Sequence, residues 1–261
     1  MTIGILAAMH DEVADLINAM IAQSGNHVQR IGMRDYHVGT FEGQQCVVVL
    51  ARIGKVAAAA TAVTLIRDFN VAEIVFTGLA GGIGQRVAVG DIVIADRLVQ
   101  HDLDARPLFP HHEVPLLGMS EFVPDNRLST ELTAAATAFL REDLPYSVSP
   151  ESRKNFGIAQ PVLHIGMIVS GDQFVADGDK ANGILSALPA ALAVEMEGAA
   201  VAQICFEYGV PCAVLRTISD RADASAHTDF GQFLRGVASH YSTGILRRFF
   251  AGRSSDSLAD R

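Results

Sequence analysis

Short runs of β-branched residues alternate along this chain with longer stretches of helical periodicity, and this alternation limits the fold more than any other feature. Residues 2–8 have the pattern of a strand, and residues 11–21 follow with apolar side chains every three or four positions, as on one face of a helix. Strands separated by helices indicate an α/β sheet with helices on both faces. A predicted hairpin at 36–41 and 45–50 makes that sheet mixed rather than purely parallel.

The same patterns predict the remaining elements. We expect further strands at 73–76, 91–95, 162–169, 192–194 and 211–217, and further helices at 54–69, 128–140, 180–188, 195–208 and 229–250. Residues 1–250 form one predicted domain. The tail at 251–261 has no periodicity and is expected to be mobile.

Composition and charge exclude several classes of protein. The 261 residues are 49% hydrophobic and carry a net charge of −9, which argues against binding to a nucleic-acid backbone. The most apolar stretch, 56–66, is about half of the ~20 residues that a membrane helix needs, and no signal peptide pattern is present. The three scattered cysteines indicate a reducing compartment. We therefore expect a cytoplasmic protein that binds neither membrane nor nucleic acid.

Acidic residues stand at the ends of three predicted strands. Glu12 follows the first strand, Glu195 and Glu197 follow a second, and Asp220 closes a third. One such acid alone is more often a residue of the first helical turn. Ligands of α/β sheets collect at the carboxyl ends of strands, however, so three acids there favour a shared site. One acid would protonate a leaving group, one would deprotonate water and one would hold sugar hydroxyls.

Other motifs have weaker interpretations. The glycines at 78–84 follow a strand but precede no helix, so they favour close passage of a ligand or strand over a dinucleotide site. The Pro-rich segment 101–124 contains His and Asp residues without a metal-ligand spacing, which favours a polar loop. Ser219, Asp220 and His227 lack the turn of a hydrolase nucleophile. We predict no metal and no organic cofactor.

Seven segments, in the same order along the chain, together point to one family. They are 7–13, 53–57, 77–82, 90–93, 170–174, 194–197 and 216–220. Their order resembles that of the 5′-methylthioadenosine/S-adenosylhomocysteine nucleosidases, within the nucleoside phosphorylase/nucleosidase superfamily. The resemblance extends from residue 3 to about residue 250. It implies a single-domain, three-layer sandwich with a twisted mixed sheet between helices, and hydrolysis of an adenine nucleoside.

The resemblance also implies a role for each matching residue. Glu12 would activate the attacking water, Asp220 with Ser219 beside it would protonate N7 of adenine, and Glu197 would bind the ribose hydroxyls. Phe174 would stack on adenine and Phe230 would cover the 5′ substituent. The other implied substrate contacts are Met9, Ile53, Val175, Glu195, Met196, Arg216 and, across the interface of a homodimer, Phe109 in the 101–124 loop.

Two departures from the family pattern keep alternatives open. Leu79 takes a position where the family commonly has Ser, and the loop after His101 lacks the family's aromatic-rich pattern. The preferred 5′ substituent therefore stays open, as does cleavage of a futalosine-type nucleoside. Arg52 and Arg216 keep phosphorolysis as an alternative, because phosphate is held by arginines and hydroxyls. The combination of three acids argues against a binding protein without catalysis.

Overall fold

Ten strands form one continuous sheet. The computed structural model describes the backbone of residues 1–259, and their side chains except at 228 and 254–259. The strand order is β2-β3-β4-β1-β5-β10-β6-β9-β8-β7. Strand β7 also pairs with β10, so β10, β6, β9, β8 and β7 close into a ring at one end of the sheet. The strands are β1 (Ile3–Ala7), β2 (His27–Ile31), β3 (Arg34–Phe41), β4 (Gln44–Leu50), β5 (Glu73–Phe76), β6 (Leu79–Gly82), β7 (Ile92–Gln100), β8 (Leu163–Ser170), β9 (Ala191–Glu195) and β10 (Cys212–Asp220).

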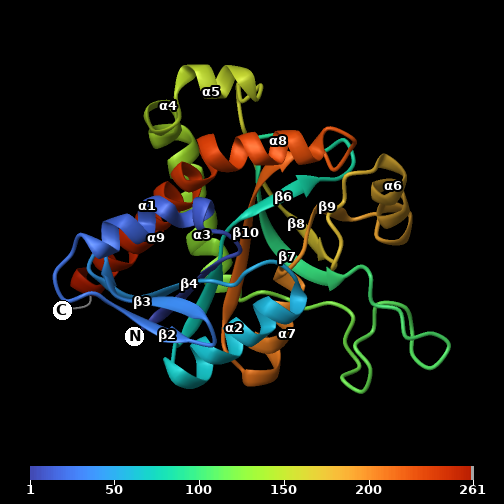
Figure 1. Ribbon diagram of the computed structural model, residues 1–261, viewed down its shortest axis with the longest axis horizontal. Helices are drawn as coiled ribbons and strands as arrows, with labels where there is room; N and C mark the ends of the chain where they lie inside the picture. Colours follow the sequence, from blue (N-terminus) through green and yellow to red (C-terminus); the bar gives the residue numbers. More distant parts are fainter. Residues whose placement is uncertain (260–261) are drawn as a thin grey trace.

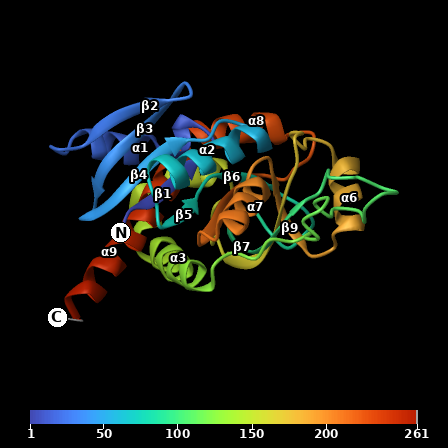
Figure 2. The same ribbon diagram turned by 90° about the horizontal axis from the view of Figure 1, so that it is seen from below.

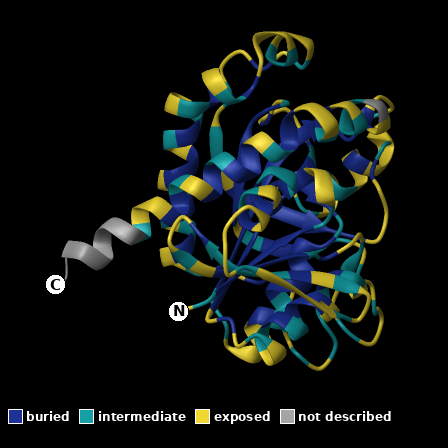
Figure 3. Cartoon of the chain, turned by 60° about the vertical axis from the view of Figure 1, so that its left-hand side comes forward, coloured by how far each residue is buried: buried dark blue, intermediate teal, exposed yellow. Residues whose placement is uncertain are grey.

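Helices cover the sheet on both faces (Figures 1 and 2). One face packs against α1 (His10–Ile21), α3 (Asn126–Ala138) and α9 (Ser239–Ala259), and the other against α2 (Lys55–Asp68) and α7 (Gly198–Tyr208). Figure 3 shows the buried strands between helices whose outer surfaces are exposed. The remaining helical segments are η1 (Phe139–Asp143), α4 (Leu144–Ser147), α5 (Pro150–Asn155), α6 (Gly178–Ala187), α8 (Ala226–Phe233) and η2 (Leu234–Ala238).

The predicted mixed α/β fold is confirmed. Strand β1 runs parallel to β4 and β5, whereas β3 pairs antiparallel with β4 in the predicted hairpin. Three layers result, with a separate apolar core on each face of the sheet. Among the described helices, none is long and apolar enough to cross a membrane.

Several predicted boundaries are wrong. The helix expected from residue 195 begins only at Gly198, because β9 runs through Glu195. Strands β2 and β6 were not predicted. The last helix continues beyond residue 250 as α9, and Arg253 forms ion pairs with Glu73 and Glu131. Residues 260–261 of the predicted mobile tail lie outside the described residues.

Candidate active site

A cavity of about 450 Å³ lies where β1, β9 and β10 end. Strands β1, β5 and β10 are parallel, which places the segments that follow β1 and β10 at one edge of the sheet. Strand β9 reaches the same place from the ring of strands, where Val194 pairs antiparallel with Gly81. The predicted site residues that line this cavity are Met9, Glu12, Ile53, Phe174, Val175, Glu195, Met196, Glu197, Asp220 and Phe230.

Glu12 is buried in the first turn of α1 and is held by three backbone donors. Its Oε2 accepts hydrogen bonds from the N–H groups of Ala8 at 2.8 Å and Met9 at 2.9 Å, and its Oε1 accepts one from Leu79 at 3.0 Å. Burial raises the pKa of the Glu12 carboxyl, although these donors and the Arg216 charge act in the opposite direction. The group is thus fixed in orientation and more basic than an exposed glutamate.

Asp220 is buried at the end of β10. The Ser219 hydroxyl donates to its Oδ2 at 2.8 Å, and the Ala222 N–H donates to its Oδ1 at 2.9 Å. Burial raises the pKa of this carboxyl, and the acidic side chains of Asp223 and Asp229 add to the effect. Asp220 therefore retains a proton at higher pH than an exposed aspartate and suits the part of a general acid.

Glu197 lies at the start of α7 and faces the same cavity. The Gly54 N–H donates to its Oε1 at 2.8 Å. Burial, together with the neighbouring Glu195 carboxylate, raises the pKa of Glu197 to about 8. Three buried carboxyl groups from three separate segments therefore surround one space.

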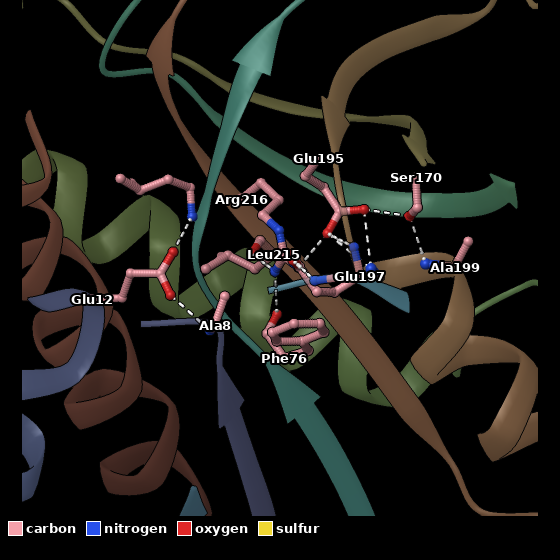
Figure 4. Close-up of polar contacts among 12 residues, drawn as sticks. Ala8, Glu12, Phe76, Ser170, Glu195, Glu197, Ala199, Leu215 and Arg216 are labelled. Carbon is pink, nitrogen blue, oxygen red and sulfur yellow. Dashed lines mark hydrogen bonds and ion pairs between the residues drawn. The ribbon is translucent and has the colours of Figure 1, made fainter. Parts of the chain in front are cut away.

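Glu195 and Arg216 form a buried pair behind the cavity (Figure 4). Arg216 Nη2 donates to Glu195 Oε2 at 2.6 Å, and the Ser170 hydroxyl and the N–H groups of Glu197 and Gly198 also donate to the Glu195 carboxylate. Although Glu195 lines the cavity, its oxygens are occupied by protein donors. Its contribution is to hold the backbone that carries Glu197.

Arg216 differs from its predicted role of contacting water or sugar. It is only 1% exposed, donates to the carbonyl oxygens of Phe76 and Leu215, and stacks over the Phe76 ring. It does not line the cavity. Its guanidinium donates to Glu195, and its charge acts on the Glu12 carboxyl.

The predicted aromatic residues form one wall. The rings of Phe174 and Phe230 meet edge to face, with centroids 5.6 Å apart. Ser219 contacts Asp220 rather than the cavity, and Phe109 lies away from the cavity of its own chain.

Seven residues that line the cavity were not predicted from the sequence: Ala8, Leu79, Ala80, Gly81, Gln173, Val194 and His227. Ala8, Gln173 and Val194 directly neighbour predicted residues in the sequence, and Leu79, Ala80 and Gly81 lie in the glycine-rich segment 78–84; these were the available signals.

The site contains no arrangement of metal ligands. Among the described residues, no group of three His, Cys, Asp or Glu side chains is placed to hold a metal ion. This includes the histidines and aspartates of the 101–124 loop, which form no such group.

Comparisons with known proteins agree with this geometry. The family described as the phosphorylase superfamily matches residues 2–251. This chain belongs to that superfamily. Among curated relatives, it is 35% identical to an aminodeoxyfutalosine nucleosidase of Helicobacter pylori, over 90% of this chain and 92% of the relative. It is 33% identical to the 5′-methylthioadenosine/S-adenosylhomocysteine nucleosidase of Lysinibacillus sphaericus, over 95% and 98% of the two chains.

Solved structures of the superfamily have the same fold. The 5′-methylthioadenosine/S-adenosylhomocysteine nucleosidase of Neisseria meningitidis, in complex with methylthio-immucillin-A, superposes with a TM-score of 0.83 at 30% identity and covers 96% of this chain and 99% of its own. A futalosine hydrolase mutant of Helicobacter pylori superposes with a TM-score of 0.80 at 30% identity, over 95% and 98%. The resemblance inferred from seven sequence segments is confirmed.

Proposed function

We propose that this phosphorylase superfamily member hydrolyses the N-glycosidic bond of an adenine nucleoside, 5′-methylthioadenosine and/or S-adenosylhomocysteine. The products are adenine and the corresponding thioribose. The observation that carries the proposal is the convergence of Glu12, Glu197 and Asp220, all buried, on one cavity with an aromatic wall. The named relatives are nucleosidases, which supports a glycosidic bond as the one broken.

Asp220 supplies the proton that adenine needs in order to leave. As the bond between C1′ and N9 breaks, its electron pair moves onto the base, and Asp220 protonates N7. Burial raises the pKa of the Asp220 carboxyl and so favours its protonated form, and the Ser219 and Ala222 donors stabilise the carboxylate that remains.

Glu12 removes a proton from the water that attacks C1′ of the ribose. Its fixed carboxylate accepts that proton while the water oxygen bonds to C1′. The sugar develops positive charge in the transition state, which nearby carboxylates stabilise. Glu197 holds the ribose hydroxyls, and the Glu195–Arg216 pair fixes its backbone.

Water fits this cavity better than phosphate as the acceptor. Among the described lining residues there is no Lys or Arg, and Leu79 offers no hydroxyl. Arg216 forms an ion pair with Glu195. Arg52 lies outside the cavity and donates to the Met33 carbonyl oxygen at 2.6 Å. Phosphate binding normally uses such cations. These contacts support hydrolysis over phosphorolysis.

Cleavage of aminodeoxyfutalosine is a second candidate function. The observation in its favour is the 35% identity to the Helicobacter pylori aminodeoxyfutalosine nucleosidase over 90% of this chain. It would use the same three carboxyl groups and differ in the 5′ substituent.

The cytoplasmic location stays a prediction from the sequence.

We propose in addition that the chain acts as a homodimer. Exposed apolar side chains on neighbouring elements support this assembly: Val56 on α2 is 82% exposed and Leu116 in the 101–124 loop is 92% exposed. Phe206 on α7, which packs beside α2, is also exposed. Contact with a second copy would cover them, and the Phe109 loop would then reach the partner's cavity.

One experiment tests the reaction and the substrate together. The chain is incubated with 5′-methylthioadenosine, S-adenosylhomocysteine and aminodeoxyfutalosine, each with and without phosphate, and the sugar product is identified by mass spectrometry. We expect free adenine and a non-phosphorylated sugar, at a rate that phosphate does not change. A sugar 1-phosphate would establish phosphorolysis, and absence of cleavage would contradict the proposal.

A further inference from the structure

The segment between β8 and α6 separates two hollow spaces. This strap, residues 171–177, carries Phe174 and Val175 on the wall of the nucleoside cavity. A second cavity, of about 320 Å³, lies behind it, and Gln173 and Val175 line both cavities. Val175 is buried in an apolar cluster with Val169 and Val194, whereas residues 172–174 are exposed and receive less support from packing. The position of residues 172–174 therefore depends more on the polar contacts at the start of the strap.

Asp102 holds the start of the strap. Its Oδ2 accepts a hydrogen bond from the Asp172 N–H at 2.8 Å, and its Oδ1 pairs with Lys55 Nζ at 2.6 Å. The Lys55 N–H in turn donates to Asp172 Oδ1 at 2.9 Å. The three residues, from the 101–124 loop, the first turn of α2 and the strap, thus close a triangle of contacts.

This triangle is partly shielded from solvent. The Lys55 side chain is 15% exposed and that of Asp102 is 28% exposed, whereas that of Asp172 is 53% exposed. Burial acts to raise the pKa of Asp102, but hydrogen bonds from Lys55 and the Asp172 N–H outweigh it and lower the pKa. Asp102 therefore carries its charge at neutral pH, and charge-assisted bonds of this kind are stronger than those between neutral groups.

The same turn of α2 also reaches the sugar end of the cavity. Gly54, next to Lys55, donates its N–H to Glu197 Oε1 at 2.8 Å. The start of α2 is therefore bonded both to the strap beside the base and to the carboxyl group beside the ribose. A displacement of the strap would change the distance between these two walls.

We propose that Asp102 is a positioning residue that clamps the strap, so that Phe174 and Val175 stand at the spacing an adenine ring requires. The inference rests on the proposed function only in naming the base. Since the strap contacts the base before and during the reaction, loss of the clamp weakens binding of substrate and transition state alike. Such a loss raises KM and leaves kcat nearly unchanged.

Asp102→Asn tests the clamp, because an amide has the same shape but can accept from only one of the two donors. We expect KM for 5′-methylthioadenosine to rise about tenfold, as for loss of one charge-assisted hydrogen bond, with kcat changed less than about threefold. Hydrogen–deuterium exchange over the strap should become faster. That readout needs no nucleoside and separates failure of the clamp from failure of the proposed function.

Asp104→Asn is the matched control. Asp104 lies in the same loop and bonds to Arg106, not to the strap. We expect its KM and strap exchange to equal those of the wild type. Should Asp102→Asn fail to fold, Lys55→Met removes the cation from the same triangle and should raise KM about threefold. Unchanged KM and unchanged strap exchange in the folded variant, or equal effects in the control, would overturn the inference.

Discussion

The three cavity carboxyl groups show how one physical effect serves different chemical roles. Burial raises the pKa of Glu12, Glu197 and Asp220 alike, because water no longer solvates the charged form. Their hydrogen bonds differ, however. Glu12 accepts from three backbone N–H groups, whereas Asp220 accepts from one N–H and one hydroxyl. More donors favour the ionised form, so Glu12 suits the base and Asp220 the acid.

Asp220→Asn should abolish most of the turnover of an adenine nucleoside. An amide keeps the hydrogen bond from Ala222 but has no acidic proton to transfer, and general acid catalysis contributes about 10²–10⁴-fold. Steady-state kinetics measures the loss, and circular dichroism checks the fold. Asp35→Asn, a change at an exposed acid on β3 that pairs with Arg30, should stay close to wild type. An Asp220→Asn enzyme with more than about a tenth of wild-type turnover would remove Asp220 from the acid role.

Glu197 should make the chain without substrate less stable at high pH. Its folded-state pKa of about 8 lies above the ordinary 4.5, so its contribution to stability is complete below about pH 4.5 and is lost as pH rises through 8. Glu197→Gln cannot ionise. We therefore expect its Tm relative to wild type to be higher at pH 9 than at pH 5, by roughly 2–6 °C.

Thermal denaturation without ligand at the two pH values measures this difference. Glu207→Gln is the control, because Glu207 is an exposed residue on the same helix, bonded to Gln203. Its Tm difference from wild type should not depend on pH in this way. The same result for both variants would assign the effect to the surface of α7 instead of the cavity.

At the scale of elements, periodicity predicted those helices and strands that have one face toward solvent and one toward the core. Helix α1 has a clear apolar face, and the β3–β4 hairpin has a turn-like Glu42-Gly43-Gln44 between its strands; both were found. Strand β2 has four exposed residues out of five, so no apolar alternation identifies it. Strand β10 is buried along its whole length, so the sequence could not tell that Arg216 faces Glu195 and not the cavity.

Strand β6 was missed because glycine has no side-chain pattern, and the structure gives the reason for its glycines. A Cβ on Gly78, just before the strand, would lie 2.9 Å from Glu12 Oε1, and one on Gly81 would lie 3.0 Å from Asp220 Oδ1. Backbone therefore passes directly beside the acid and the base. The prediction that this segment admits close approach of a ligand or strand agrees with β6 pairing with both β9 and β10.

Alanine substitutions in this segment should separate activity from stability. Gly78→Ala pushes on the end of the Glu12 side chain and should lower kcat at least about tenfold with little change in Tm. Gly82→Ala places a Cβ 2.8 Å from Val87 Cγ2 in the core and should cost about 1–3 kcal/mol of stability. Gly183→Ala, with open space around it, is the control. Loss of stability without loss of kcat in Gly78→Ala would contradict the argument.

At the scale of the whole molecule, the cavity is assembled from segments far apart in sequence. Glu12, Phe174, Glu197 and Asp220 come together because the ring of strands brings β9 and β10 beside the end of β1. The three acids were predicted from their places at the ends of strands, and Phe174 was predicted from the family resemblance; all four line the cavity. The contacts between the segments, such as that from Gly54 to Glu197, have no local sequence signal.

A loop that projects from the body of the chain bears on assembly. The 101–124 loop extends from the body of the chain (Figure 1), and Phe109 on it does not reach the cavity of its own chain. If two copies associate, light scattering should give twice the 27.8 kDa of one chain. Phe109→Ala should then weaken binding of nucleosides with bulky 5′ groups about tenfold relative to adenosine, because burial of one Phe contributes about 1.5–3 kcal/mol. Tyr146→Ala, at an exposed ring on α4, should affect neither ligand. A monomer at micromolar concentration, or equal losses for both nucleosides, would show that each chain completes its cavity alone.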